Sequence, residues 1–148
     1  MSDLNLNSLY QQLILDHYRK PRNKGELPEK TVEIHMANPV CGDEIRLQLQ
    51  IEDDRIVDAR HVGQGCSISQ ASVSMMTNIL KGKELTDAEA LADRFTAMMH
   101  GDEEPARDKA MGDLRALQGV SKFPVRIKCA LLAFDALQEA IKKTRAER

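Results

Sequence analysis

The sequence predicts an α+β fold, in which helices cover one face of a small three-stranded antiparallel sheet. Three segments with alternating apolar and polar residues, at 32–36, 45–51 and 55–62, follow one another with short connections. Such alternation is typical of strands that have one buried and one solvated face, as in an antiparallel sheet. Most segments with helical periodicity come after this block rather than between its strands, which favours the α+β class over a parallel α/β sheet.

Helices are expected before and after the strands in the sequence. Asn7 or Ser8 can cap a first helix that runs to about residue 19, and Gly82 would end a helix that begins after Cys66. Three further helices are expected at about 86–99, 109–117 and 123–143.

Length, charge and hydropathy exclude several functional classes. The 148 residues fit a single domain, 1–148, with a core large enough to need no disulfides. A net charge of −2, from 21 basic and 23 acidic residues, argues against nucleic acid as the main partner. No apolar run reaches the roughly 18 residues of a membrane span, and the N-terminus lacks the pattern of a signal peptide. We therefore expect a cytoplasmic protein without a membrane partner.

The three cysteines, Cys41, Cys66 and Cys129, are the first candidates for function. An odd number of thiols in a reducing compartment does not suit a disulfide framework. Cys41 and Cys66 are flanked by glycine and polar residues at the ends of expected strands, which is unusual for thiols that only pack in a core. Cys129 lies beside Ala130 and Leu131 on the last helix and could by itself be a core residue.

Asp43 adds a fourth possible ligand to these thiols. It follows Cys41 by two residues in a turn at 38–43 that contains Pro39 and Gly42, and such a turn can direct both side chains to one point. Cys66 directly precedes one helix and Cys129 lies near the start of another, so three loops are expected to meet at one rim of the sheet. Three thiolates and one carboxylate form a tetrahedral set suited to Zn²⁺ or an iron–sulfur cluster rather than Mg²⁺ or Ca²⁺.

Arg126 is a candidate partner of this site rather than a ligand. It precedes Cys129 by about one helical turn and could offset the negative charge of four anionic ligands around a dication. The alternative is an ordinary solvated arginine. The histidines show no ligand spacing and are expected at the surface or in an interface; they are His17, His35, His61 and His100.

Four motifs together cover nearly the whole chain. They are Asp16-His-Tyr-Arg-Lys-Pro-Arg-Asn23, Asn38-Pro-Val-Cys41-Gly-Asp43, Gly63-Gln-Gly-Cys66-Ser-Ile-Ser-Gln-Ala-Ser72 and Lys122-Phe-Pro-Val-Arg126-Ile-Lys-Cys129-Ala130. In combination they resemble the NifU/IscU-type iron–sulfur scaffold family. The resemblance implies the SufE/NifU-like scaffold fold.

Three departures from the IscU-type members point to the SufU branch of this family. Lys128 stands where those members carry a histidine immediately before the third cysteine. An additional helical segment, at about 84–117, separates the second and third cysteines. The Leu-Pro-Pro-Val-Lys peptide that a dedicated Hsp70 chaperone recognises in scaffold members is replaced at 122–126, which argues against chaperone-assisted release of a cluster.

The resemblance implies a zinc-dependent sulfurtransferase in iron–sulfur cluster assembly. Cys41, as the thiol in a glycine-flanked turn, would take persulfide sulfur from a SufS-type cysteine desulfurase and pass it to downstream Suf components. Zn²⁺ would be held by Cys41, Asp43, Cys66 and Cys129. Two alternatives stay open: a scaffold on which these residues assemble a [2Fe–2S] cluster, and a zinc-stabilised interaction module without chemistry.

Overall fold

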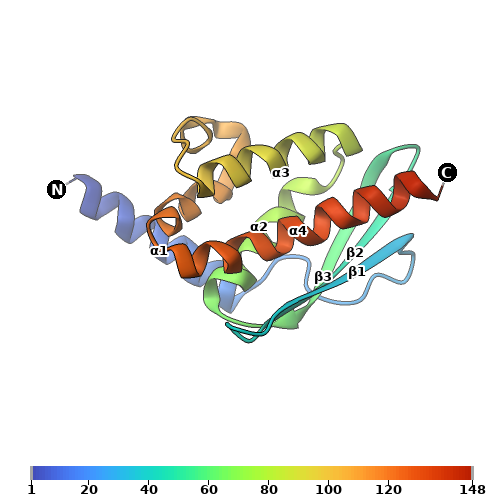
Figure 1. The fold of residues 1–148 in the computed structure, drawn as a ribbon, viewed down its shortest axis with the longest axis horizontal. Coiled ribbons are helices and arrows are strands. Elements are labelled where there is room, and N and C mark those ends of the chain that lie inside the picture. Colours follow the sequence, from blue (N-terminus) through green and yellow to red (C-terminus); the bar gives the residue numbers. More distant parts are fainter. Residues whose placement is uncertain (1, 148) are drawn as a thin grey trace.

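Three antiparallel strands form the sheet of this protein, in the order β1-β2-β3. The computed structural model describes residues 2–147, and side chains from residue 8 onward. The strands are β1 (Val32–Asn38), β2 (Asp43–Glu52) and β3 (Arg55–Gln64), as Figure 1 shows. The predicted α+β class and its three-stranded antiparallel sheet are confirmed.

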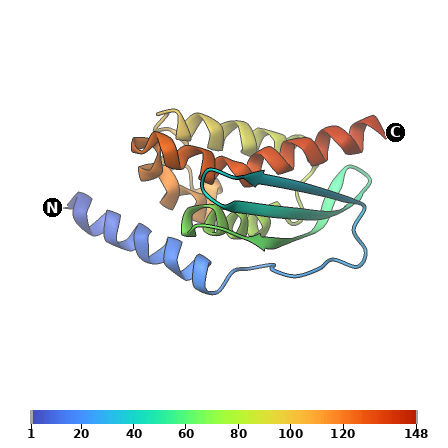
Figure 2. The ribbon, with the colours of Figure 1, turned by 60° about the horizontal axis from the view of Figure 1, so that its bottom comes forward.

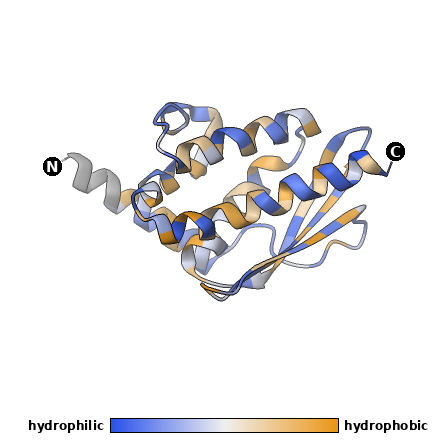
Figure 3. Ribbon diagram, in the orientation of Figure 1, coloured by the Kyte–Doolittle hydropathy of each residue, from blue (hydrophilic) through white to orange (hydrophobic). Residues whose placement is uncertain are grey.

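The alternation in β2 arises because one face of the sheet is buried under helices. Ile45, Leu47 and Leu49 are almost fully excluded from solvent and belong to the main hydrophobic core. The same strand pairs with β1 from Asn38 opposite Asp43 to Val32 opposite Leu49, so β1 and β2 are joined by a short turn. Figure 3 shows the resulting mixture of hydrophobic and hydrophilic positions along the strands and along the last helix.

Helices supply the rest of the fold. They are α1 (Ser2–Arg19), α2 (Ser67–Leu80), α3 (Leu85–Met99), η1 (Pro105–Arg107), η2 (Lys109–Lys122) and α4 (Pro124–Ala146). Helix α4 packs along β1 and β2, and α2 packs against α4 and β3 (Figure 2). Within the described residues, no helix combines the length and hydropathy needed to cross a membrane.

The additional segment between the second and third cysteines forms an outer layer. Helix α3 lies beside α4 (Figure 1), where Phe95 and Phe134 stack with ring centroids 4.2 Å apart. The predicted helix at 109–117 is too short: 3₁₀ turns continue to Lys122 and are interrupted at Gly112, whose φ of 55° and ψ of −137° are not helical. The start predicted for the first helix is also wrong, since α1 begins at Ser2.

The histidines divide into two groups. His35 and His100 are exposed, as predicted, but the prediction is wrong for His17 and His61, which are 0% and 1% exposed. Both buried rings form hydrogen bonds with residues that are far away in the sequence. His61 Nε2 donates to the Arg22 carbonyl at 2.9 Å, so it helps to fix the loop between α1 and β1.

His17 connects three helices through a chain of hydrogen bonds. The Arg22 amide donates to Ser74 Oγ at 2.8 Å, and Ser74 Oγ lies 2.7 Å from His17 Nδ1. His17 Nε2 lies 2.8 Å from Asp113 Oδ2. With the proton on Nε2, every group in this chain has a partner, and the chain joins α1 to α2 and to η2.

The burial of His61 predicts a loss of stability in acid. Burial, assisted by the charge of Lys24, lowers the pKa of His61 from 6.5 to about 4. Between these values the unfolded chain binds a proton that the folded chain does not, so the free energy of unfolding falls as the pH falls. From about pH 7 to about pH 4.5 this amounts to about 2 kcal/mol from His61 alone.

The variant His61→Gln tests this, because a glutamine amide can still donate to the Arg22 carbonyl but does not titrate. Urea unfolding at the two pH values should show a smaller acid destabilisation in the variant than in the unaltered protein, by about 2 kcal/mol. Equal pH dependence in both proteins would contradict the prediction.

Candidate metal centre

Three of the four predicted ligands, Cys41, Asp43 and Cys129, come together where the β1–β2 turn meets the beginnings of α2 and α4, and Cys66 adjoins this group through Asp43. Cys41 Sγ and Cys129 Sγ are 3.1 Å apart, and Cys66 Sγ lies 3.8 Å from Asp43 Oδ2. One ligand atom from each of Cys41, Asp43 and Cys129 can be chosen so that all lie within 4.8 Å of one another. Residues separated by up to 88 positions in sequence therefore share one small region.

The β1–β2 turn positions Cys41 at the edge of this group. The Cys41 amide donates to the Asn38 carbonyl at 3.2 Å, which closes the turn directly after the last residue of β1. Gly42 has a φ of 69°, a conformation that glycine adopts without strain. Cys41 is partly exposed and follows Val40, whose exposed fraction is 87%. Of the two candidate ligands in this turn, Cys41 is therefore more accessible than Asp43, which is buried.

Asp43 is buried and oriented by the backbone of the next segment. Its Oδ1 accepts a 2.8 Å hydrogen bond from the Cys66 amide, which leaves Oδ2 facing the thiols. A ligating carboxylate held in this way has little freedom to turn away from a metal. The same hydrogen bond also joins the start of β2 to the start of α2.

Cys66 caps helix α2. Its Sγ accepts a hydrogen bond from the Ser69 amide at 3.5 Å, as a serine or aspartate cap would. The backbone amides and the positive end of the helix dipole at this position stabilise a neighbouring negative charge. Cys66 is therefore suited to act as an anionic ligand.

Cys129 lies inside the protein at the second turn of α4. Burial raises the pKa of the Cys129 thiol above its ordinary value, and the neighbouring Cys41 and Asp43 groups raise it further. A bound dication would act in the opposite direction, because it stabilises thiolates directly. A bound metal would thus offset the free energy needed to place a negative charge on the buried Cys129 sulfur.

The donor set fits zinc in both chemistry and spacing. Bonds of about 2.3 Å to sulfur and about 2.0 Å to oxygen place tetrahedral ligand atoms roughly 3.5–4 Å apart. Cys41, Asp43 and Cys129 offer ligand atoms that lie within 4.8 Å of one another, near that spacing, and Cys66 adjoins them through Asp43. Cys41, Asp43, Cys66 and Cys129 would hold the ion, and their role as ligands stays a prediction.

Gly65 has a structural role that the sequence analysis did not identify. A Cβ atom at Gly65 would lie 2.5 Å from Asp43 Oδ1 and 2.8 Å from Ser69 Oγ. Only a residue without a side chain allows the backbone to approach the carboxylate so closely. The sequence signal was present, because Gly63-Gln64-Gly65 directly precedes Cys66.

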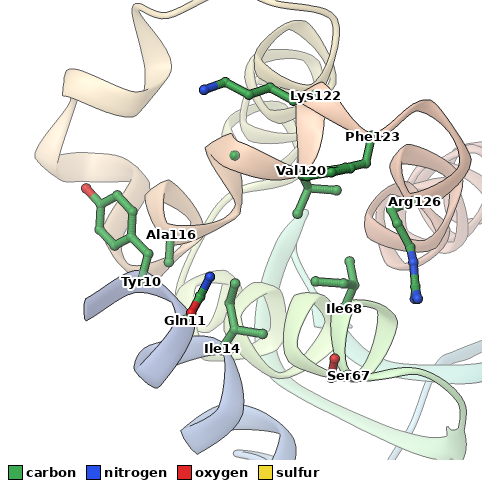
Figure 4. Close-up of a pocket in the computed structure, with 11 residues that line it drawn as sticks. Tyr10, Gln11, Ile14, Ser67, Ile68, Ala116, Val120, Lys122, Phe123 and Arg126 are labelled. Carbon is green, nitrogen blue, oxygen red and sulfur yellow. The ribbon is translucent and has the colours of Figure 1, made fainter. Parts of the chain in front are cut away.

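Arg126 lies in the first turn of α4, three residues before Cys129. It is exposed and, together with Ser67 and Ile68 at the start of α2, lines a cavity (Figure 4). Its proposed effect on the charge of the centre stays a prediction.

Comparison with known proteins places this fold and centre in a family. Residues 9–130 match the model of the NifU-like N-terminal domain. The chain belongs to this family. The NifU-like chain is 50% identical over 140 residues to the zinc-dependent sulfurtransferase SufU of Bacillus subtilis, which covers 94% of the chain and 93% of that protein.

Two further similarities agree with this membership. The iron–sulfur cluster assembly scaffold protein IscU of Streptococcus pyogenes is 45% identical over 139 residues, covering 94% of the NifU-like chain and 86% of the relative. A crystal structure of a putative iron–sulfur cluster assembly scaffold protein for the SUF system from Fervidobacterium islandicum superposes with a TM-score of 0.77. Its sequence identity is 30%, over 88% of this chain and 94% of that one. The resemblance expected from the motifs is confirmed.

Replacing Gly65 should weaken metal binding without removing a ligand. In Gly65→Ala the new methyl group would displace the Asp43 carboxylate, and disturbing such a supporting contact costs about 10- to 100-fold in metal affinity. Zinc affinity is measured by competition with a chromophoric chelator.

Gly82→Ala is the matched control for this measurement. Gly82 follows the other end of α2 and has a φ of 87°, but a Cβ there meets no atom within 4 Å. The substitution Gly82→Ala therefore strains the backbone at a position away from the candidate metal centre. Equal zinc affinity in Gly65→Ala and Gly82→Ala would show that the close approach to Asp43 is unimportant.

Proposed function

We propose that this NifU-like protein is a zinc-dependent sulfur acceptor in iron–sulfur cluster assembly, which takes persulfide sulfur on Cys41 from a SufS-type cysteine desulfurase. The observation that carries the proposal is the gathering of Cys41, Asp43 and Cys129, with Cys66 beside Asp43 and the partly exposed Cys41 in a turn. The similarity to a relative named a zinc-dependent sulfurtransferase supports it. We place the reaction in the cytoplasm, where thiols stay reduced.

Zinc, when bound, would supply a positive charge that keeps the thiols deprotonated, and it has no redox chemistry of its own. The protein would hold it through Cys41, Asp43, Cys66 and Cys129. Asp43 contributes a carboxylate that is already oriented by the Cys66 amide. Arg126, close to this charged group along α4, would moderate its negative charge.

Cys41 is better placed than the other thiols to carry sulfur. Cys129 is buried, and Cys66 is tied by hydrogen bonds at its amide and at its sulfur. As a thiolate, Cys41 would attack the terminal sulfur of the persulfide on the desulfurase. The sulfur–sulfur bond of that persulfide breaks, the desulfurase cysteine leaves as a thiolate, and Cys41 carries the new persulfide. Downstream Suf components would then receive this sulfur.

A second function is supported by the relative named as a cluster assembly scaffold. The same four residues would then bind a [2Fe–2S] cluster as cargo, and the cluster would later be passed on. Anaerobic incubation with ferrous iron, cysteine and the desulfurase separates the two functions. A scaffold should accumulate a coloured cluster that an apo-ferredoxin can take up, whereas a sulfur acceptor should raise sulfide production without holding a cluster.

The decisive variant is Cys41→Ala. We expect the unaltered protein to stimulate sulfide production by the SufS-type desulfurase and the variant to lose this stimulation, because the attacking thiolate is absent. Mass spectrometry without reductant should locate one additional sulfur atom on the peptide that contains Cys41.

Val57→Ala is the control, since it alters an exposed valine on β3 and keeps every ligand atom. Zinc content is measured in both variants, so that loss of metal is not mistaken for loss of the carrier. Full stimulation by Cys41→Ala, or additional sulfur only on Cys66, would contradict the assignment.

A further inference from the structure

A cavity of about 560 Å³ opens beside the metal centre. Its walls come from α1, the start of α2, η2 and the start of α4, and Figure 4 shows their side chains surrounding it. Most of the lining is apolar and includes Tyr10, Ile14, Ile68, Val120 and Phe123. A hollow of this size and composition can receive a large apolar side chain.

The cavity and the metal centre share one rim. Ser67, which lines the cavity, directly follows Cys66, and Arg126 precedes Cys129 by one helical turn. A protein that delivers sulfur to Cys41 therefore has the mouth of this cavity within its contact surface.

The charges of the cavity are of one sign. Among the residues that line it, the charged ones are Lys122 and Arg126, and no carboxylate accompanies them. Their charged ends point to different sides of the cavity (Figure 4), so an occupant with acidic groups on either side of its apolar group would pair with them. Such complementarity favours encounter and orientation of a partner.

Exposed apolar side chains occur at the cavity, beside it in the sequence, and in the turn that carries Cys41. Phe123 and Val125 are 61% and 69% exposed, and Val40, next to Cys41, is 87% exposed. Apolar groups exposed outside a cavity indicate contact with an extended surface, which favours a polypeptide over a small molecule as the occupant.

We propose that the cavity accepts a segment of the sulfur-donating desulfurase, which inserts an apolar side chain and places acidic groups near Lys122 and Arg126. This proposal rests on the proposed function, because that function identifies the protein that must lie over the rim.

The cavity is formed before any partner binds. Helix η2, which forms one wall, is fixed to α1 by the contact of Asp113 with His17, and His17 is fixed to α2 by Ser74. A preorganised cavity reduces the entropy that a partner loses when it docks. Helix η2 thus serves as a preformed wall of the docking site.

Gly119 allows the cavity to be filled from within. It lines the cavity, its backbone has an ordinary negative φ, and a Cβ built on it meets no atom within 4 Å. Gly119→Trp should occupy the space intended for the partner, whereas Gly119→Ala should leave it open. Calorimetric titration with the SufS-type desulfurase, in the absence of its cysteine substrate, should give a Kd at least about tenfold weaker for Gly119→Trp than for Gly119→Ala.

Lys122→Glu tests the charge of the mouth. This substitution should also weaken binding to the desulfurase about tenfold. Added salt should weaken the binding of the unaltered protein more than that of the variant. The control is Lys143→Glu, the same charge change at an exposed position near the far end of α4. If Gly119→Trp does not fold by circular dichroism, the two lysine variants decide.

Failure of this proposal can be told apart from failure of the proposed function. Unchanged binding by Gly119→Trp and Lys122→Glu would overturn the docking site, even where sulfide production still requires Cys41. Weakened binding by both, together with full stimulation by Cys41→Ala, would uphold the docking site and reject Cys41 as the carrier. Absence of binding by the unaltered protein would overturn both.

Discussion

The hydrogen bond from the Cys66 amide to the Asp43 carboxylate is the contact on which the metal centre depends. At 2.8 Å it joins the first residue of β2 to the cap of α2, and it directs the second carboxylate oxygen toward the thiols. The contact is possible because Gly65 has no side chain to separate the two segments. One interaction thus positions a strand, a helix and a candidate ligand.

The layers of the fold supply the remaining parts of the site at fixed positions. Helix α4 lies along the sheet and brings Cys129 to the end where the β1–β2 turn carries Cys41 (Figure 1). Helix η2 does not supply a proposed ligand, but it forms a wall of the neighbouring cavity and is fastened to α1 through Asp113 and His17. The rigid parts of the chain therefore position the proposed ligands and shape the proposed docking surface, while the proposed sulfur carrier, Cys41, lies in the turn between two strands.

Much of this organisation follows from local sequence patterns, and the failures have physical causes. Alternation in β2 predicts the sheet because each strand has one face under the helices, and the spacing of Cys41 and Asp43 predicts their convergence because the turn between them is short. The burial of His17 could not be predicted in this way, since its partners Ser74 and Asp113 are 57 and 96 residues away. The irregular course of η2 also escaped prediction, because tertiary packing rather than helical periodicity determines it.

The most direct test of this account is X-ray absorption at the zinc edge on protein purified in air, combined with metal analysis. The account predicts one zinc per chain, with three sulfur ligands at about 2.3 Å and one oxygen at about 2.0 Å, and a change in the oxygen shell alone when Asp43 is replaced by Ala. A protein without tightly bound zinc, or a shell with fewer than three sulfur ligands, would contradict the central claim.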